Sequence, residues 1–278
     1  MPELPEVETV RRGLARTFVG RRIEAVWIGR PRSVRRTSAE EVILRLTGTA
    51  ALAAERKGKY LLCPLDSGDV LMVHLRMSGQ LLIDRFGSDR PLHTHVALRL
   101  ADGNELRFVD PRTFGEVVVF DPSAEPTIVP DLMALGPDPI TDELSLAELR
   151  RRLRSTRRAA KAVLLDQHFV AGIGNIYGDE ILHRSGISPL RPANRISYVQ
   201  STRLHGAIHE VLTEAIDAGG STLADAQYVD LMGEGGTFQE SHRVYGRSGC
   251  PCLTCGRGRV VSGVVGGRTT SWCRVCQR

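Results

Sequence analysis

The stretch YLLCPLDSGDVLMVHL, residues 60–75, places two short apolar runs on either side of the turn-forming residues Asp66, Ser67 and Gly68. Two apolar runs separated in this way predict a pair of antiparallel strands. Further short apolar runs occur between about residues 21 and 120: IEAVWI, VALRL, LRFV and EVVVF. Because successive runs lie close together in the sequence, we expect an antiparallel β-sandwich or barrel.

The sequence before and after this region predicts helices. Residues 7–18 have apolar side chains at helical spacing. Five prolines between residues 121 and 143 indicate a linker. Ser145 and Glu148 then form a capping box that opens a basic helix, and a second helix is expected from about 157 to 168. The segment up to the 240s is therefore predicted to be a helical domain.

Composition and charge favour a soluble protein with a polyanionic partner. The chain has 278 residues, 42% of them hydrophobic and 25% charged, with a formal net charge of +5. No run approaches the ~18 apolar residues of a membrane helix, and the N-terminus lacks the pattern of a signal peptide. We therefore expect a cytoplasmic protein. Only three lysines occur, so the pair Lys57 and Lys59 in RKGKY stands out among the arginines.

Five of the six cysteines lie between Cys250 and Cys276. Two CxxC pairs separated by seventeen residues match the spacing of a four-thiolate structural zinc site. The predicted ligands are Cys252, Cys255, Cys273 and Cys276. Cys250 is left over because only Cys252 gives the two-residue spacing, and a redox or disulfide role is the alternative. The last residues contain few apolar side chains and need such a metal to fold.

Two segments are candidates for binding anions. GIGNIYGDE, residues 172–180, places glycines and Asn175 just before a helix, where free N–H groups can bind a phosphate. A tight turn capped by the asparagine explains the same residues equally well. The segment between the two CxxC pairs reads as a hairpin that presents Arg257, Arg259 and Arg268, which suits a phosphate backbone but also a protein partner.

The N-terminal segment MPELPE permits two interpretations. Pro2 and Glu3 can simply precede a helix as a capping turn. Alternatively, removal of Met1 would leave the Pro2 nitrogen as an amine, a large fraction of which is neutral at physiological pH. A neutral amine can attack an electrophilic sugar carbon, and Glu3 and Glu6 can supply acid–base groups beside it.

Taken together, the motifs resemble the bacterial formamidopyrimidine-DNA glycosylases, within the endonuclease VIII superfamily. The resemblance covers essentially the whole chain in the right order, and it lies in these segments: MPELPEVETV, KGKYL, HLRMSGQL, DPRTFGE, GIGNIYGDEIL, GGSTL, TFQESHRVYGR and GRTTSWCRVCQ. It implies a bifunctional DNA glycosylase and AP lyase that removes oxidised purines, notably 8-oxoguanine and formamidopyrimidines, by base excision repair. It also implies duplex damaged DNA as the partner, and we expect a monomer.

The resemblance implies a role for each matching residue. Pro2 would be the nucleophile that attacks C1′ and supports β,δ-elimination, with Glu3, Glu6 and Lys59 assisting the chemistry. Three side chains would fill the space left by the flipped base: Met77, Arg112 and Phe114. Asn175 and Arg268 would bind phosphates, and a lesion-capping loop would lie near residues 225–239.

The fold class that follows is α+β: an N-terminal antiparallel β-sandwich with an N-terminal helix, and a C-terminal helix–two-turn–helix domain with a four-Cys zinc finger. The expected domains are a catalytic domain at 1–121, a linker at 122–143, the DNA-binding helical domain at 144–243 and the zinc finger at 244–278. Two alternatives are a glycosylase of the endonuclease VIII type for oxidised pyrimidines and a catalytically silent zinc-containing DNA-binding protein. The presence of Pro2, Glu3 and Lys59 argues against the silent protein.

Overall fold

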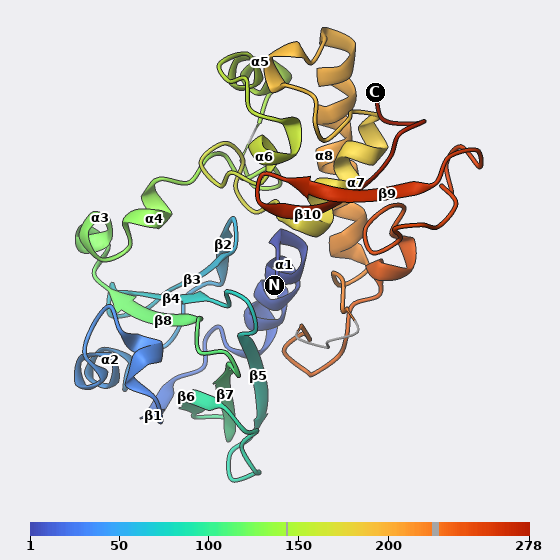
Figure 1. Ribbon diagram of the computed structural model, residues 1–278. Helices are drawn as coiled ribbons and strands as arrows, with labels where there is room; N and C mark the ends of the chain where they lie inside the picture. Colours follow the sequence, from blue (N-terminus) through green and yellow to red (C-terminus); the bar gives the residue numbers. More distant parts are fainter. Residues whose placement is uncertain (143, 224–227) are drawn as a thin grey trace. The chain divides into compact units, whose positions relative to one another are not determined.

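A computed structural model describes residues 1–142, 144–223 and 228–278 (Figure 1). The chain forms two compact units. The first contains Met1–Ala134 and Ala218–Thr237, and the second contains Leu135–Asp217 and Phe238–Arg278. Within the described ranges, no helix combines the length and apolar character needed to cross a membrane.

The first unit consists of an N-terminal helix and two antiparallel sheets of four strands. Helix α1 (Leu4–Thr17) precedes the strands. One sheet has the order β1-β6-β7-β5 and the other the order β2-β3-β4-β8. The strands are β1 (Ile23–Ile28), β2 (Glu55–Lys57), β3 (Tyr60–Pro64), β4 (Val70–His74), β5 (Gln80–Arg85), β6 (Thr94–Leu100), β7 (Asn104–Val109) and β8 (Glu116–Phe120). The predicted antiparallel β domain with an N-terminal helix is confirmed.

The hairpin predicted from residues 60–75 joins β3 to β4. Tyr60 pairs with His74 and Pro64 pairs with Val70, while Gly68 takes a positive φ of 94° in the turn between the strands. Apolar side chains of both sheets and of α1 share one core. They include Val10, Leu14, Leu61, Leu71, Val73, Val96, Leu98, Leu106, Phe108 and Val117. The alternating side chains of the two sheets therefore bury one another, as in a sandwich.

Short helices accompany the strands of the first unit. Two lie between β1 and β2: η1 (Pro31–Val34) and α2 (Ala39–Leu46). Three lie in the proline-rich stretch after β8: η2 (Pro122–Ala124), α3 (Glu125–Ile128) and α4 (Pro130–Met133). Each of these three has proline in its first turn, where the missing N–H costs nothing. The prolines thus form short helical turns within the region for which the sequence predicts a linker.

The second unit is mainly helical and ends in a two-stranded hairpin. Its helices are α5 (Leu146–Arg154), α6 (Ala160–Leu164), α7 (Asn175–Ser185), η3 (Ala193–Arg195), α8 (Tyr198–Asp217) and η4 (Phe238–Ser241). The hairpin consists of β9 (Val260–Val265) and β10 (Arg268–Cys273). Helix α7 packs against α8, α6 and β10. The helix predicted at 157–168 is wrong in length, because α6 covers only five residues.

Residues 218–237 return to the first unit after α8. The Ile83 N–H donates to the Leu231 carbonyl at 3.0 Å, and the Ser221 N–H donates to the Glu6 carboxylate at 2.7 Å. The compact units therefore interleave in sequence, and the domain boundaries given above remain a prediction. Part of the predicted lesion-capping loop at 225–239, namely residues 225–227, lies outside the described residues.

A buried ion pair ties α6 to α7 and β10. The Lys161 ammonium lies 2.7 Å from Asp179 Oδ1 and donates to the Asn175 carbonyl at 2.7 Å, and both side chains of the pair are almost completely buried. Asp179 Oδ2 accepts the Ser271 N–H at 2.8 Å. This network fixes the start of α7 against the C-terminal hairpin.

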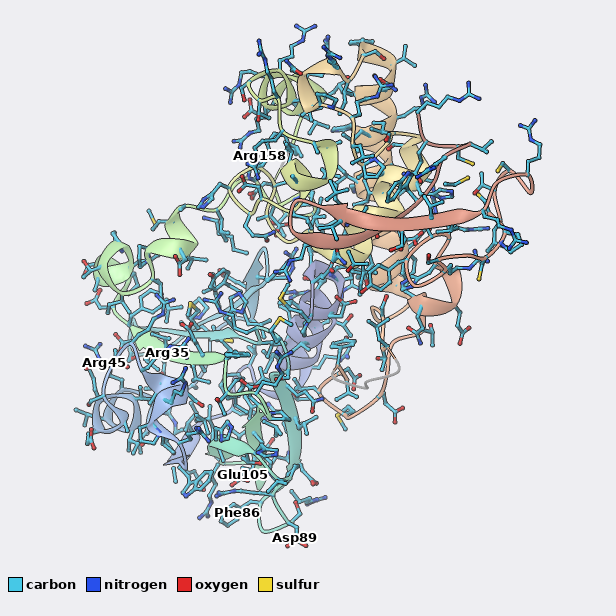
Figure 2. The ribbon with its side chains drawn as sticks, viewed as in Figure 1. Arg35, Arg45, Phe86, Asp89, Glu105 and Arg158 are labelled. Carbon is cyan, nitrogen blue, oxygen red and sulfur yellow. The ribbon has the colours of Figure 1, made fainter. Side chains whose placement is uncertain are left out.

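Lys161→Met should lower the free energy of unfolding by about 3–5 kcal/mol, because it leaves the Asp179 carboxylate buried without its cation. Urea unfolding followed by circular dichroism measures the loss. Arg158→Met is the control, since Arg158 (Figure 2) pairs with Asp166 at the surface and should contribute less than about 1 kcal/mol. Equal losses for the two variants would contradict the role of burial.

Candidate active site and metal centre

The N-terminal segment is buried and held by the carboxylate of Glu6. Pro2 is buried, and Glu3 and Glu6 are 2% and 1% exposed. Glu6 Oε2 accepts the Glu3 N–H at 2.7 Å, and Oε1 accepts the Ser221 N–H at 2.7 Å. Gly220 makes room for this contact, because a Cβ there would lie 2.7 Å from Glu6 Oε1. The segment before α1 therefore has a fixed position with respect to residues 220–221.

Tyr228, which no sequence motif predicts as a site residue, lies close to the same carboxylate. Its hydroxyl donates to the Gly219 carbonyl at 2.9 Å. Burial and the charge of Glu6 raise the pKa of Tyr228 above its ordinary value, so the phenol stays protonated. No local motif marks this tyrosine, because its neighbours in space are Glu6 and Thr9 of α1 and Gly219, which follows α8.

Lys59 occupies the turn between β2 and β3. Lys57 pairs with Tyr60, which leaves Gly58 and Lys59 as a two-residue turn, and Gly58 has a φ of +57°. The Lys59 residue is only 7% exposed. The predicted position in a β-hairpin is therefore observed.

An ion pair anchors this turn to α1. The Arg56 guanidinium donates to Glu8 at 3.1 Å and to the Gly58 carbonyl at 3.1 Å. Burial alone would raise the pKa of Glu8. Hydrogen bonds from Arg11 and Arg56 nevertheless hold this pKa below its ordinary value. Glu8 and Arg56 are 48 residues apart in the chain, so only the Glu8–Arg11 spacing on one helix gives a local signal in the sequence.

Met77, Arg112 and Phe114 lie on two loops of the first unit that are joined by Asp110. Asp110 Oδ1 accepts from the Ser78 hydroxyl at 2.6 Å and from the Arg112 N–H at 3.2 Å. Asp110 Oδ2 accepts the Gly115 N–H at 2.7 Å. A side chain at Gly115 would collide with Phe108 at 2.5 Å. One completely buried carboxylate therefore holds both loops together.

Strained backbone flanks the three candidate side chains. Arg76 and Thr113 have φ values of 53° and 58°, which cost free energy in residues other than glycine. Burial and the nearby Arg76 guanidinium hold the pKa of His74 well below its ordinary value. In keeping with this, its Nδ1 accepts the Arg76 N–H at 3.0 Å. Such strain is common where a loop must present a side chain in a defined direction.

Arg112 and Phe114 are exposed and stack on each other. The Arg112 guanidinium carbon lies 5.3 Å from the centre of the Phe114 ring, and Phe114 is 44% exposed. Met77 is half-buried on the neighbouring loop. His95 donates from Nε2 to the Asp110 carbonyl at 2.8 Å. The three candidates thus share one support, which no sequence motif indicated.

Asp110→Asn should lower the free energy of unfolding by about 2–3 kcal/mol. The amide NH₂ of asparagine would replace one of the two acceptor oxygens. It would then face either the Ser78 hydroxyl or the Gly115 N–H, both of which are donors. Denaturant unfolding of the full chain measures this. Asp121→Asn is the matched control, since Asp121 is an exposed cap and asparagine caps equally well. A loss below about 0.5 kcal/mol for Asp110→Asn would contradict the proposed support of the loops.

In the second unit, Asn175 and the residue after Arg268 are in contact. Asn175 Nδ2 donates to the Thr269 carbonyl at 2.9 Å, and Arg268 is exposed at the start of β10. Gly174, rather than Asn175, is the cap of α7, so the interpretation of Asn175 as a helix cap is wrong. Asn175 Oδ1 is buried and has no donor among the described residues. The second unit thus brings Asn175 close to the hairpin that carries Arg268.

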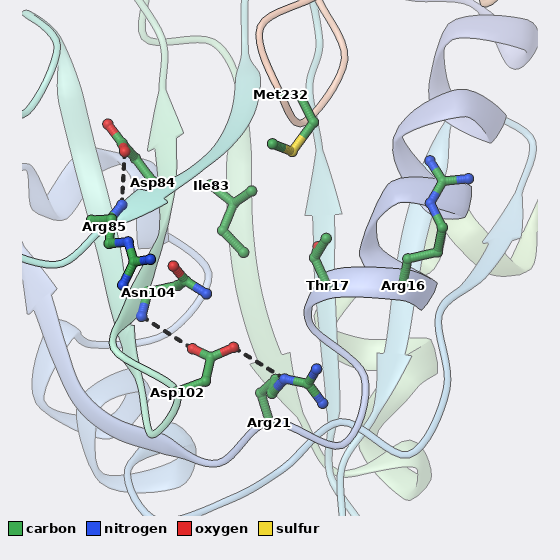
Figure 3. Close-up of a pocket in the computed structure, with 9 residues that line it drawn as sticks. All are labelled: Arg16, Thr17, Arg21, Ile83, Asp84, Arg85, Asp102, Asn104 and Met232. Atoms are coloured by element: carbon green, nitrogen blue, oxygen red, sulfur yellow. Dashed lines mark hydrogen bonds and ion pairs between the residues drawn. The ribbon is translucent and has the colours of Figure 1, made fainter.

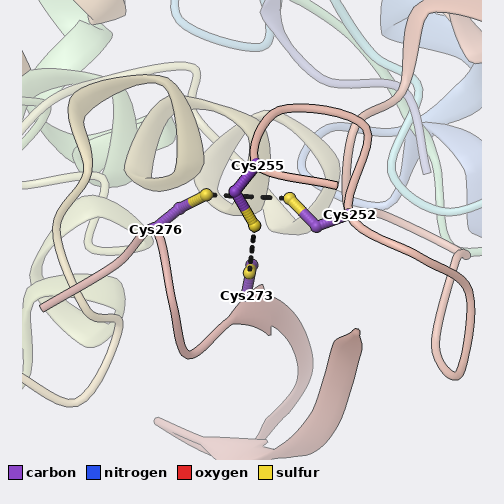
Figure 4. A group of neighbouring side chains, drawn as sticks. All are labelled: Cys252, Cys255, Cys273 and Cys276. Atoms are coloured by element: carbon purple, nitrogen blue, oxygen red, sulfur yellow. Dashed lines mark hydrogen bonds between the residues drawn. The ribbon is translucent and has the colours of Figure 1, made fainter. Parts of the chain in front are cut away.

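Four cysteine sulfurs of the second unit converge on one point (Figure 4). All four lie within 4.8 Å of one another, with 3.7 Å between Cys252 and Cys276 and 3.8 Å between Cys255 and Cys273. Tetrahedral bonds of ~2.3 Å from sulfur to one ion place the sulfurs about 3.8 Å apart, so the group fits a metal ion. Hydrogen bonds from the N–H groups of Gly258 and Arg257 lower the pKa of Cys255 to about 6. Cys250 is exposed and outside the group.

The first unit also contains a pocket of about 340 Å³ (Figure 3). Arg16, Ile83 and Met232 line it, and Asp102 accepts from both Arg21 and the Asn104 N–H. None of the candidate site residues lines this pocket.

Family models and related sequences all assign the chain to one family of proteins. The formamidopyrimidine-DNA glycosylase N-terminal domain matches residues 1–117, and the H2TH domain of the same family matches residues 135–227. A formamidopyrimidine-DNA glycosylase of Bacillus licheniformis is 45% identical, with all of both chains covered. These matches, together with a β-sandwich followed by a helical unit with four clustered cysteines, define a DNA glycosylase.

Solved structures agree with this class. The Lactococcus lactis Fpg in complex with DNA containing an abasic site has a TM-score of 0.90 at 34% identity, with 99% of each chain covered. The MutM (Fpg) protein of Thermus thermophilus has a TM-score of 0.89 at 40% identity, covering 99% of this chain and 98% of that one. The chain belongs to the formamidopyrimidine-DNA glycosylase family.

Proposed function

We propose that this protein removes oxidised purines, notably 8-oxoguanine and formamidopyrimidines, from duplex DNA and then cleaves the strand as an AP lyase. The observation that carries the proposal is the buried Pro2–Glu3 segment, which Glu6 and residues 220–221 hold in place. The Lactococcus lactis relative bound to DNA with an abasic site supports damaged DNA as the partner.

In this proposal Pro2 is the nucleophile once Met1 has been removed. Its neutral nitrogen attacks C1′, the bond from C1′ to the base breaks, and the base leaves with a proton. Glu3 protonates the sugar ring oxygen as the C1′–O4′ bond opens, which yields an iminium between C1′ and the Pro2 nitrogen. Loss of a C2′ proton then expels the 3′-phosphate, and a second elimination expels the 5′-phosphate. Hydrolysis of the iminium frees Pro2.

The remaining residues bind and position the substrate. Lys59 contacts a phosphate near the reacting sugar, and Glu6 keeps Pro2 and Glu3 in place through its contact with the Glu3 N–H. Met77, Arg112 and Phe114 fill the space that the flipped nucleotide leaves, with Phe114 stacking on a base and Arg112 bonding the orphaned partner base. Asn175 and Arg268 bind phosphates, and Asn175 Oδ1, which has no donor within the described part of the chain, can accept a hydrogen bond.

We also infer that the four cysteines hold one structural zinc ion. The donor set is sulfur only, and the two CxxC pairs close the site with four ligands, which suits zinc in a structural role. When bound, zinc would supply folding free energy for β9 and β10 rather than chemistry at the sugar.

Incubation with two damaged duplexes in the presence of borohydride tests the proposed reaction. One duplex carries 8-oxoguanine opposite cytosine and the other carries thymine glycol. Borohydride reduces the iminium to a stable amine, so a covalent complex with the first duplex and little with the second is the expected result. A complex formed mainly with thymine glycol would favour a pyrimidine glycosylase of the endonuclease VIII type. No complex with either, with Met1 removed, would leave a DNA-binding protein without this chemistry.

A further inference from the structure

His183 of helix α7 contacts one of the four clustered cysteines. Its Nε2 lies 3.7 Å from the Sγ of Cys252. Both residues are buried, with His183 at 6% and Cys252 at 1% exposed. The group of potential metal ligands consists of four cysteines and does not include His183. His183 therefore contacts one of these cysteines without being a ligand itself.

The same helix makes two further contacts with the C-terminal segment. Asp179, four residues before His183, accepts the Ser271 N–H of β10 at 2.8 Å. Glu180, three residues before it, accepts the N–H groups of residues 243–245 at 2.8–2.9 Å. Positions three and four apart lie on one face of a helix. One face of α7 therefore makes three contacts with the C-terminal segment. Glu180 contacts residues 243–245, which precede the first CxxC pair. His183 contacts Cys252 of that pair, and Asp179 contacts β10, whose last residue begins the second pair.

A donor at this position has a clear chemical effect. Four thiolates around a divalent cation leave an excess of negative charge on sulfur, and N–H groups directed at the sulfurs stabilise it. Cys255 receives such a bond from the Gly258 N–H at 3.3 Å. The imidazole N–H of His183 offers Cys252 the equivalent bond from a different element of the fold.

We propose that His183 is a positioning residue of the metal centre, which donates its Nε2–H to the Cys252 thiolate and so ties metal retention to helix α7. The inference rests on the proposed zinc site. Its consequence is that the helix that begins at Asn175 and the cluster of four cysteines hold each other in place.

Two substitutions of His183 in the full-length zinc-loaded protein test this. His183→Phe keeps a planar ring but removes the N–H donor, and His183→Gln retains a donor at similar reach. We expect His183→Phe to release zinc to a coloured chelator at least about 10-fold faster than the original protein, as is usual when a partner of a metal ligand is lost, and His183→Gln to recover most of the difference. His242→Phe is the control, because His242 is also buried in this unit but packs against the rings of Phe238 and Tyr245.

A spectroscopic measurement separates hydrogen bonding from simple packing. With Co²⁺ in place of zinc, the thiolate-to-metal charge-transfer band should shift in His183→Phe and stay near its original position in His183→Gln and His242→Phe. Identical release rates and bands for all four proteins would overturn the inference and leave the proposed zinc site intact. A wild-type protein that binds no zinc would overturn the zinc site and this inference, while the borohydride test would still decide the reaction. If His183→Phe does not fold, His183→Met replaces it as the variant without an N–H.

Discussion

Pro2→Gly, in protein whose Met1 has been removed, should reduce borohydride trapping with the 8-oxoguanine duplex by about 100-fold or more. Glycine keeps an amine at the terminus, but a primary one without the pyrrolidine ring that holds the Pro2 nitrogen in a fixed direction. Pro2 is buried in a segment that Glu6 holds, so its nitrogen has a defined position that a flexible glycine would lose. Misplacing a reacting group by about 1 Å costs on the order of 100-fold in rate.

Two measurements complete this test. Mass spectrometry of each protein establishes that Met1 is absent, because an added residue would convert the proposed nucleophile into an amide nitrogen. Binding to a duplex with a stable abasic-site analogue should be the same for both proteins, since the substitution removes no phosphate contact. Trapping by Pro2→Gly at the wild-type level would refute Pro2 as the nucleophile.

Cys273→Ser should abolish zinc binding and, with it, most of the affinity for DNA. A serine hydroxyl replaces one of four sulfurs, and Cys273 is also the last residue of β10, the strand that begins at Arg268. The free energy of structural zinc binding, about 10–16 kcal/mol in small fingers, is largely folding free energy for the segment that binds it. We expect zinc content to fall below about a tenth of the wild-type value and DNA affinity to fall by about 100-fold.

Cys250→Ser is the matched control for this prediction. Cys250 lies two residues before Cys252, yet it is exposed and outside the cluster. Zinc content by atomic emission and DNA binding by fluorescence anisotropy should therefore match the unsubstituted protein. A loss of zinc in Cys250→Ser equal to that in Cys273→Ser would show that the ligand set differs from the one proposed.

Local patterns in the sequence were sufficient for much of the fold. The apolar runs around residues 60–75 predicted strands that pair as expected, because the turn and the runs are adjacent in the chain. The two CxxC pairs predicted a cluster for the same reason, since each pair places two sulfurs together over four residues. The helix expected at 157–168 was too long because Asp166 accepts the His168 N–H at 3.0 Å, a local turn that competes with a helix.

The features of the structure that the sequence did not predict depend on contacts between residues far apart in the chain. The return of residues 218–237 to the first unit depends on Glu6 and Ile83, each more than 130 positions away from its partner. The bond between Asp110 and Ser78 joins residues 32 positions apart, and it forms only when the fold brings two loops together.

The support provided by Asp110 has a consequence for how such sequences diverge. Its carboxylate serves Ser78, Arg112 and Gly115 at once, and Gly115 has no space for a side chain. A lineage that replaced Asp110 alone would lose the support of both loops in one step. Positions 78, 110 and 115 should therefore be inherited as a block, because a change at one of them removes a partner or the space that the other two need.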